Sequence, residues 1–79
     1  MLEEALAHLV RGIVDSPEEV TVSLRSNRRG ACLEVRVNPE DMGRVIGRSG
    51  RTATALRTVV NALQGGRGVR IDFLDLAER

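Results

Sequence analysis

The spacing of apolar residues along the chain predicts a helix first and then two strands. In residues 1–14 the apolar side chains recur at helical spacing: Leu2, Ala5, Leu6, Leu9, Val10 and Ile13. This pattern predicts an amphipathic helix that ends near Asp15, because Pro17 disfavours helical geometry at the residue before it.

Residues 20–37 instead alternate between apolar and polar side chains, as strands with one solvated face do. The apolar positions are Val20, Val22 and Leu24 in the first run and Ala31, Leu33, Val35 and Val37 in the second. The polar residues 27–30 between the runs predict a turn, so the two strands should form an antiparallel hairpin. Near the C-terminus Val69, Ile71 and Phe73 alternate with Arg70 and Asp72, which predicts a third strand.

Two helices are expected between the second and third strands. Asn38 is a favourable cap and Pro39 suits a first helical position, so a short helix should run from there to Ile46. A longer helix should begin near Gly50 or Arg51 and end at the glycine pair at 65–66. Its expected buried stripe comprises Thr52, Ala55, Leu56, Val59, Val60 and Leu63.

The predicted order is α-β-β-α-α-β, an α+β fold in one domain that covers residues 1–79. A crossover through two helices is long enough to make the second and third strands parallel, which gives a mixed three-stranded sheet. All three helices should cover one face of this sheet. The other face should be open and polar, carrying Thr21, Ser23, Cys32, Glu34, Arg36, Arg70 and Asp72.

Composition excludes several classes of protein. Apolar residues make up 42% of the chain and charged residues 29%, which is typical of a globular domain and not of a disordered one. No apolar run reaches the about 18 residues of a membrane-spanning helix, and the acidic start at Glu3 and Glu4 is unlike a signal peptide. One histidine and one cysteine, His8 and Cys32, cannot form a zinc site, so we expect no metal, no cofactor and no enzymatic activity. The single cysteine is also typical of a reducing compartment.

Charge is concentrated in the middle of the chain. Residues 1–41 carry five Arg and eight acidic residues, whereas residues 42–71 carry six Arg and no acidic residue. This basic block inside a protein of net charge +1 indicates an anionic partner that binds at one site.

The basic block contains a candidate binding loop, Gly47-Arg48-Ser49-Gly50, between the two central helices. Glycine at both corners permits positive φ and close approach of another backbone, and the following helix offers free N–H groups. These features suit a nucleic-acid phosphate backbone whose bases turn into an apolar groove. A Gly-x-x-Gly spacing is also typical of a plain corner between helices. The candidate RNA-binding residues are Arg44, Val45, Ile46, Gly47, Arg48, Ser49, Gly50 and Arg51.

Residues 42–53 resemble the signature of KH domains, and the element order resembles their type II arrangement. Residues 15–20, 39–43 and 57–60 extend the similarity to the small stand-alone KH proteins of bacteria. The resemblance implies a cytoplasmic protein that binds single-stranded RNA at residues 47–50, with Val45 and Ile46 as apolar support. It also implies a homodimer, pairing with a larger KhpB-like protein (also called Jag or EloR), and a link to cell elongation and division as a post-transcriptional regulator or RNA chaperone.

The alternative is a protein-interaction module whose RNA binding is incidental, with pairing through the open sheet face or the first helix. We expect a pairing surface near the loop that includes Ala53 and Val60.

A dinucleotide site and a Walker A loop are excluded because their glycine patterns are absent. Phe73 is the one aromatic residue and is expected in the core, which argues against modules that stack bases on several aromatics.

Overall fold

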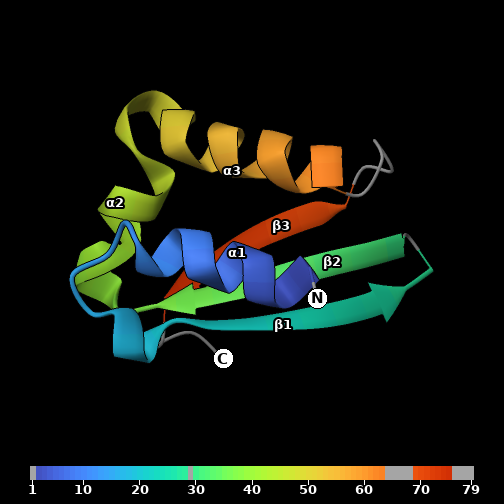
Figure 1. The fold of residues 1–79 in the computed structure, drawn as a ribbon, viewed down its shortest axis with the longest axis horizontal. Coiled ribbons are helices and arrows are strands. Elements are labelled where there is room, and N and C mark those ends of the chain that lie inside the picture. Colours follow the sequence, from blue (N-terminus) through green and yellow to red (C-terminus); the bar gives the residue numbers. More distant parts are fainter. Residues whose placement is uncertain (1, 29, 64–68, 76–79) are drawn as a thin grey trace.

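Three helices and three strands make up the computed structural model, which describes residues 2–28, 30–63 and 69–75 (Figure 1). The helices are α1 (Leu2–Arg11), α2 (Met42–Ile46) and α3 (Arg51–Leu63), and the strands are β1 (Thr21–Asn27), β2 (Gly30–Val37) and β3 (Arg70–Asp75). Short 3₁₀ turns occupy Pro17–Glu19, Pro39–Asp41 and Arg48–Gly50. The predicted order α-β-β-α-α-β is therefore confirmed.

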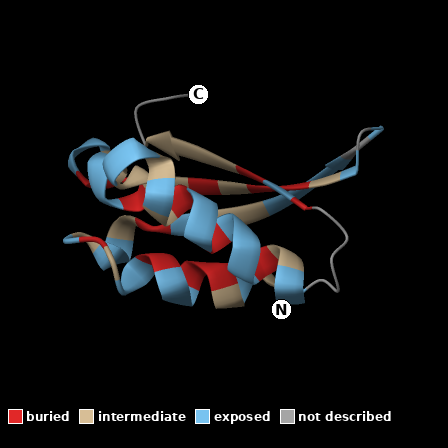
Figure 2. Cartoon of the chain, turned by 90° about the horizontal axis from the view of Figure 1, so that it is seen from above, coloured by how far each residue is buried: buried red, intermediate tan, exposed pale blue. Residues whose placement is uncertain are grey.

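The strands form one mixed sheet in the order β1-β2-β3. β1 and β2 are antiparallel, with Thr21 opposite Arg36, and β2 and β3 are parallel, with Val35 opposite Phe73. All three helices lie on the same side of this sheet (Figure 2). The fold is thus α+β with a three-stranded mixed sheet, as predicted.

The core fills the space between the helices and the inward face of the sheet. Its buried members are Leu6, Val10, Val14, Val20, Leu33, Val35, Val37, Val45, Leu56, Val60, Val69 and Ile71. β2 contributes three fully buried valine and leucine side chains because it is the central strand and is covered by helices. Phe73 is half-buried and packs against this core, in agreement with its expected inward position.

The first helix is shorter than predicted, and the predicted face is partly wrong. α1 ends at Arg11, and the residues that follow form a turn in which the Gly12 N–H bonds the His8 carbonyl at 3.3 Å. Ala7 is buried, whereas Leu9 is 37% exposed. Ala7 and Leu9 flank a face centred between Leu6 and Val10, each about 80° from its centre, since each residue turns the helix by about 100°. Spacing alone therefore does not decide which of the two is covered, and the packing of α1 covers the Ala7 side. His8 is exposed.

The buried face of α3 also differs from the prediction. Ala53, Leu56 and Val60 point into the core, while Val59 is 43% and Leu63 is 60% exposed. The apolar residues of α3 cover about half of its circumference, which is wider than the face that packs against the core, so spacing alone could not select the inward part of it. Because Ala53 and Val60 are buried within one chain, their expected place on a pairing surface is wrong. The glycine pair expected to end α3 lies outside the described residues.

A buried carboxylate fixes the approach to α2. Asp41 is 2% exposed, and its two carboxylate oxygens accept hydrogen bonds from the backbone N–H groups of Asp15 and Ser16, each at 3.1 Å. These bonds offset the cost of burying the charge and join the connection after α1 to the turn before α2. Asn38 caps the same turn as predicted, since its side chain accepts from the Glu40 N–H at 2.8 Å.

The polar face of the sheet carries Cys32 in the position predicted from the alternation, but its thiol is buried. The Cys32 Sγ donates to Asp72 Oδ2 at 3.2 Å across β2 and β3. Burial, and then this hydrogen bond, raises the pKa of the Cys32 thiol above its ordinary value of 9.0. Glu34 lies between Arg25 and Arg36, at 3.3 and 3.6 Å. Within the described ranges no helix is long and apolar enough to cross a membrane.

Candidate nucleic-acid interface

Three of the four residues in the loop between α2 and α3 have positive φ. Gly47 has φ 77°, Ser49 has φ 56° and Gly50 has φ 74°. The Gly47 N–H bonds the Gly43 carbonyl at 2.9 Å and ends α2, and the Gly50 N–H bonds the Gly47 carbonyl at 3.1 Å. Two of these residues are glycines, which adopt positive φ without steric cost, so the predicted corner is explained.

Gly47 is required for a second reason, which is the close approach of α3. A β-carbon on Gly47 would overlap the side chain of Thr52 and would lie 2.8 Å from the Thr52 backbone nitrogen. A β-carbon on Gly50 would meet nothing within 4 Å. The two glycines therefore have different roles: Gly47 lets the first turn of α3 pack onto the end of α2, and Gly50 supplies a conformation alone.

The arginines predicted to contact RNA do not share one environment. Arg48 and Arg51 are exposed, and neither forms a salt bridge with an acid in the described part of the chain. Arg44 is also exposed, but its Nη2 lies 3.0 Å from Asp15 Oδ2. The positive end of the 13-residue helix α3 thus has two uncovered cations beside it and a third that is paired.

The apolar pair before the loop anchors it. Val45 is fully buried in the core, and Ile46 is half-buried against the core. Val45 therefore supports the loop from below and presents no surface to a ligand. Ile46 keeps part of its side chain accessible at the start of the loop.

A further cation near the loop was not selected from the sequence. The Arg57 guanidinium carbon lies 5.6 Å from the centre of the Phe73 ring, on the border between α3 and β3. On the same border, Asn61 Oδ1 accepts from the Val69 N–H at 2.9 Å. The sequence signal was available: both residues follow Ala53, which is buried, at steps of four along α3.

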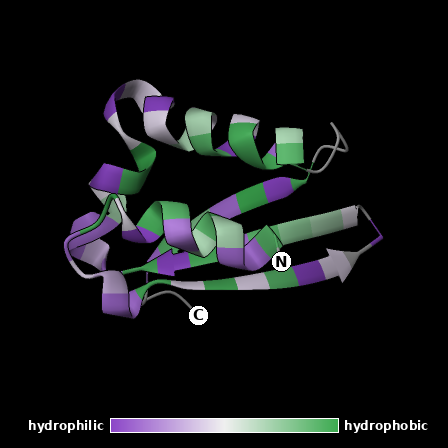
Figure 3. Cartoon of the chain, viewed as in Figure 1, coloured by the Kyte–Doolittle hydropathy of each residue, from purple (hydrophilic) through white to green (hydrophobic). Residues whose placement is uncertain are grey.

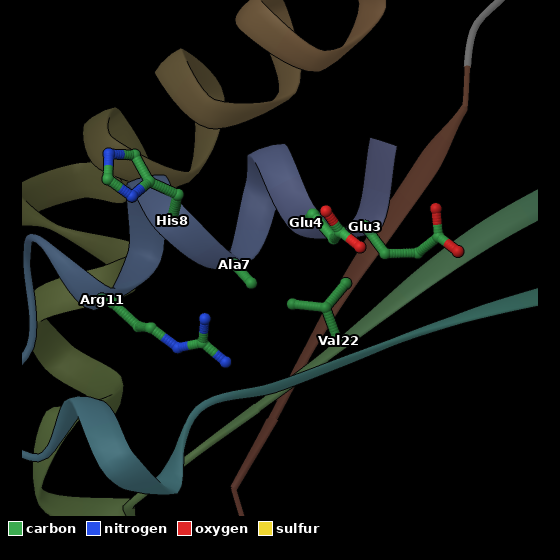
Figure 4. Close-up of a pocket in the computed structure, with 6 residues that line it drawn as sticks. All are labelled: Glu3, Glu4, Ala7, His8, Arg11 and Val22. Atoms are coloured by element: carbon green, nitrogen blue, oxygen red, sulfur yellow. The ribbon is translucent and has the colours of Figure 1, made fainter. Parts of the chain in front are cut away.

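A separate hollow of about 430 Å³ lies between α1 and β1 (Figure 4). Its lining residues are Glu3, Glu4, Ala7, His8, Arg11 and Val22. The side chains of both charge signs that line it give no net preference for an anion, so the hollow does not extend the basic surface of the loop. Within the ranges that the structure describes, no group of three His, Cys, Asp or Glu side chains is placed to hold a metal ion.

The fold has the order α-β-β-α-α-β, and its two central helices connect the parallel strands β2 and β3 along the chain. A Gly-x-x-Gly loop joins these two helices. This arrangement defines a type II KH domain. Residues 3–73 match the model of the KhpA/KhpB KH domain family. The chain belongs to this family.

Similar proteins cover nearly the whole chain. A protein of Streptomyces coelicolor is 67% identical over 76 residues, covering 96% of this chain and 95% of the relative. A protein of Mycobacterium tuberculosis is 60% identical over 72 residues, covering 91% and 89%, and one of Halalkalibacterium halodurans is 41% identical over 76 residues, covering 94% and 100%. Each of these relatives is named RNA-binding protein KhpA.

A solved structure shares the fold at low sequence identity. It is the crystal structure of Era in complex with MgGDPNP and nucleotides 1506–1542 of 16S ribosomal RNA. The match has a TM-score of 0.56 and 13% identity, and it covers 94% of this chain but 29% of the Era chain. At this identity the similarity concerns the fold alone.

Proposed function

We propose that this chain binds single-stranded RNA at the Gly47–Gly50 loop and acts without catalysis. The observation that carries the proposal is the pair of uncovered cations, Arg48 and Arg51, at the positive end of α3. The relatives named RNA-binding protein KhpA support the same ligand.

In the proposed complex the loop binds the backbone of the RNA strand, and the RNA bases turn toward α3 and β3. Phosphate groups lie against the loop because Arg48 and Arg51 supply positive charge there. A single strand is the preferred form, since its bases are free to leave the backbone axis and reach protein side chains, whereas those of a duplex are paired.

The test replaces Arg48 and Ser49 together with Asp, which puts two carboxylates where phosphate is proposed to lie. RNA affinity, measured by fluorescence anisotropy, should fall by at least about tenfold, while the circular dichroism spectrum stays that of wild type. The matched control makes the same change at Ser26 and Arg28, which are exposed near the β1–β2 turn. Equal losses in both variants, or no loss in the first, would show that the loop is not the site.

The proposal includes pairing of the chain, with itself and with a KhpB-like protein, in the cytoplasm. Exposed apolar side chains on two adjacent helices support it: Leu9 on α1, and Val59 and Leu63 on α3. In Figure 3 apolar positions continue to the C-terminal end of α3. Two paired loops can engage one RNA and gain avidity, which suits a post-transcriptional regulator or RNA chaperone. The proposed link to cell elongation and division rests on the resemblance to KhpA relatives.

The second candidate function is a protein-interaction module whose RNA binding is incidental. The same exposed side chains, Val59 and Leu63, favour it. The two functions separate in one comparison: under the main proposal the loop variant loses RNA and still pairs, and a cell phenotype follows the loss of RNA binding. Under the alternative the phenotype follows the loss of pairing alone.

A further inference from the structure

The guanidinium of Arg57 lies over the ring of Phe73, the one aromatic residue in the chain. The distance of 5.6 Å from the guanidinium carbon to the ring centre is within the about 6 Å at which a cation and a ring attract each other. Phe73 is half-buried and packed against the core, and it stands opposite Val35 of the central strand. The ring is therefore a fixed support for Arg57.

Arg57 itself remains exposed and has no acidic partner in the described part of the chain. The acid next to Phe73 in sequence, Asp72, points to the other face of the sheet, where it contacts Cys32 and Arg70. The guanidinium group thus lies over the ring while the Arg57 side chain remains exposed to solvent.

The position of Arg57 relates it to the binding loop. Arg57 follows Arg51 by six residues, which is about 9 Å along the axis of α3. Farther along the same border, the Asn61 side chain is bonded to the Val69 backbone and joins α3 to the start of β3. Arg57 thus lies between the loop and the Asn61–Val69 bond. An RNA strand bound as proposed, with its bases turned toward α3 and β3, reaches Arg57 on this border.

We propose that Arg57 is a stacking platform for one RNA base, with Phe73 as its support; this inference rests on the proposed function. A guanidinium is planar and delocalised, and unpaired RNA bases stack on such planes as they do on aromatic rings. The chain has no second aromatic residue to offer, so Arg57 takes the place of an aromatic platform. The ligand is a single strand that carries a base at this position, and a purine binds better than a pyrimidine because its larger ring system stacks more strongly.

The test compares Arg57→Ala and Arg57→Lys with wild type on three octamers: octa-adenylate, octa-uridylate and an abasic strand with the same number of phosphates. Lys keeps the charge and lacks the plane. Both variants should weaken octa-adenylate binding by about three- to tenfold and reduce its advantage over octa-uridylate. Binding of the abasic strand should stay within twofold for Arg57→Lys. Thr58→Ala, at the next exposed residue, is the control and should match wild type.

Three results would overturn the stacking role. Arg57→Lys could retain wild-type affinity and base preference, which would make Arg57 a phosphate contact. Arg57→Ala could weaken binding of the abasic strand as much as binding of octa-adenylate, which would also make Arg57 a phosphate contact. Both variants could bind as wild type while the Arg48 and Ser49 double variant loses RNA, which would leave the proposed function intact and remove Arg57 from it. If wild type binds none of the octamers, the proposed function fails as well.

Discussion

Arg44 on α2 is held by Asp15 in the connection after α1, with Arg44 Nη2 and Asp15 Oδ2 at 3.0 Å. The backbone of Asp15 is itself fixed, because its N–H donates to the buried carboxylate of Asp41. A carboxylate therefore stands beside the first arginine of the basic block. It competes with any phosphate that approaches Arg44.

Replacing Asp15 with Asn should release Arg44 and increase RNA affinity by about two- to fivefold, because an exposed salt bridge contributes up to about 1 kcal/mol. The backbone bond to Asp41 is unaffected by the change. With two phosphate contacts, from Arg48 and Arg51, the plot of log K against log salt should have a slope of about −1.4, and with Arg44 added about −2. Anisotropy titrations at several salt concentrations measure both quantities.

The control for that prediction is Glu18→Gln, which removes one negative charge from the same connection at an exposed residue that does not bridge Arg44. It should leave the slope at the wild-type value. If Glu18→Gln and Asp15→Asn change the slope equally, the effect is general electrostatics and the salt bridge has no specific part.

Gly47 should be the least replaceable glycine of the loop. Gly47→Ala combines positive φ with overlap on Thr52, so we expect a loss of more than about 2 kcal/mol in the free energy of unfolding. In Gly50→Ala the alanine has an unfavourable positive φ but its β-carbon meets no other atom, so the free energy of unfolding should fall by about 1 kcal/mol. Gly43→Ala lies in α2 with open space and ordinary φ, and should be neutral or stabilising by up to about 1 kcal/mol.

Thermal unfolding followed by circular dichroism ranks the three glycine variants, since about 1 kcal/mol corresponds to 4–8 °C in a domain of this size. Tm should be highest for Gly43→Ala, intermediate for Gly50→Ala and lowest for Gly47→Ala. A Gly47→Ala protein as stable as Gly50→Ala would show that α3 can move away from the loop at little cost.

The sheet and the loop could be predicted from the sequence because their signals are local. Alternation fixes which side chains of a strand share a face, and the glycines at 47 and 50 mark the corner between two helices. The inward face of α3 could not be chosen in this way. Val59 and Val60 are equally apolar, and the packing of α3 on the sheet and on α1 decides that Val60 is buried.

Contacts between distant segments also cannot be predicted from local spacing. The role of Asp41 as acceptor for backbone groups 25 and 26 residues away depends on the path of the chain, which the local sequence does not give. The Arg57–Phe73 contact likewise depends on how α3 lies against β3. Spacing along the chain indicates which side chains share a face of a helix or strand. Which of these faces contact each other is determined by the fold.

The thiol of Cys32 should be unreactive in the folded protein. Its pKa is raised, mainly because burial disfavours the thiolate, so the proton is bound more tightly in the folded state than in the unfolded state. The stability from this group is then fully present below the ordinary pKa of 9.0 and is lost as pH rises above it. A thiol-specific reagent should modify native protein at pH 8 at least about tenfold more slowly than protein in urea.

Cys32→Ala is the matched variant for the pH dependence. Between pH 8 and 10 the wild-type free energy of unfolding should fall more steeply than that of Cys32→Ala, because the variant lacks the titrating group. Parallel curves, together with equal modification rates for native and unfolded protein, would show that Cys32 is accessible and has its ordinary pKa.

Val59 should mark the surface through which the chain pairs, and Ala53 should not. Val59→Glu places a charge on an exposed apolar position of α3, so a dimer should dissociate at unchanged fold, since Glu is a good helix former. Ala53→Glu instead buries a charge at a residue 2% exposed and should unfold the domain. Thr58→Glu puts the same charge on the neighbouring exposed residue and should leave pairing intact. Sedimentation equilibrium of each variant, with circular dichroism as the test of folding, decides the matter: a monomeric wild type, or a Val59→Glu protein that still dimerises, would remove this surface from the proposed function.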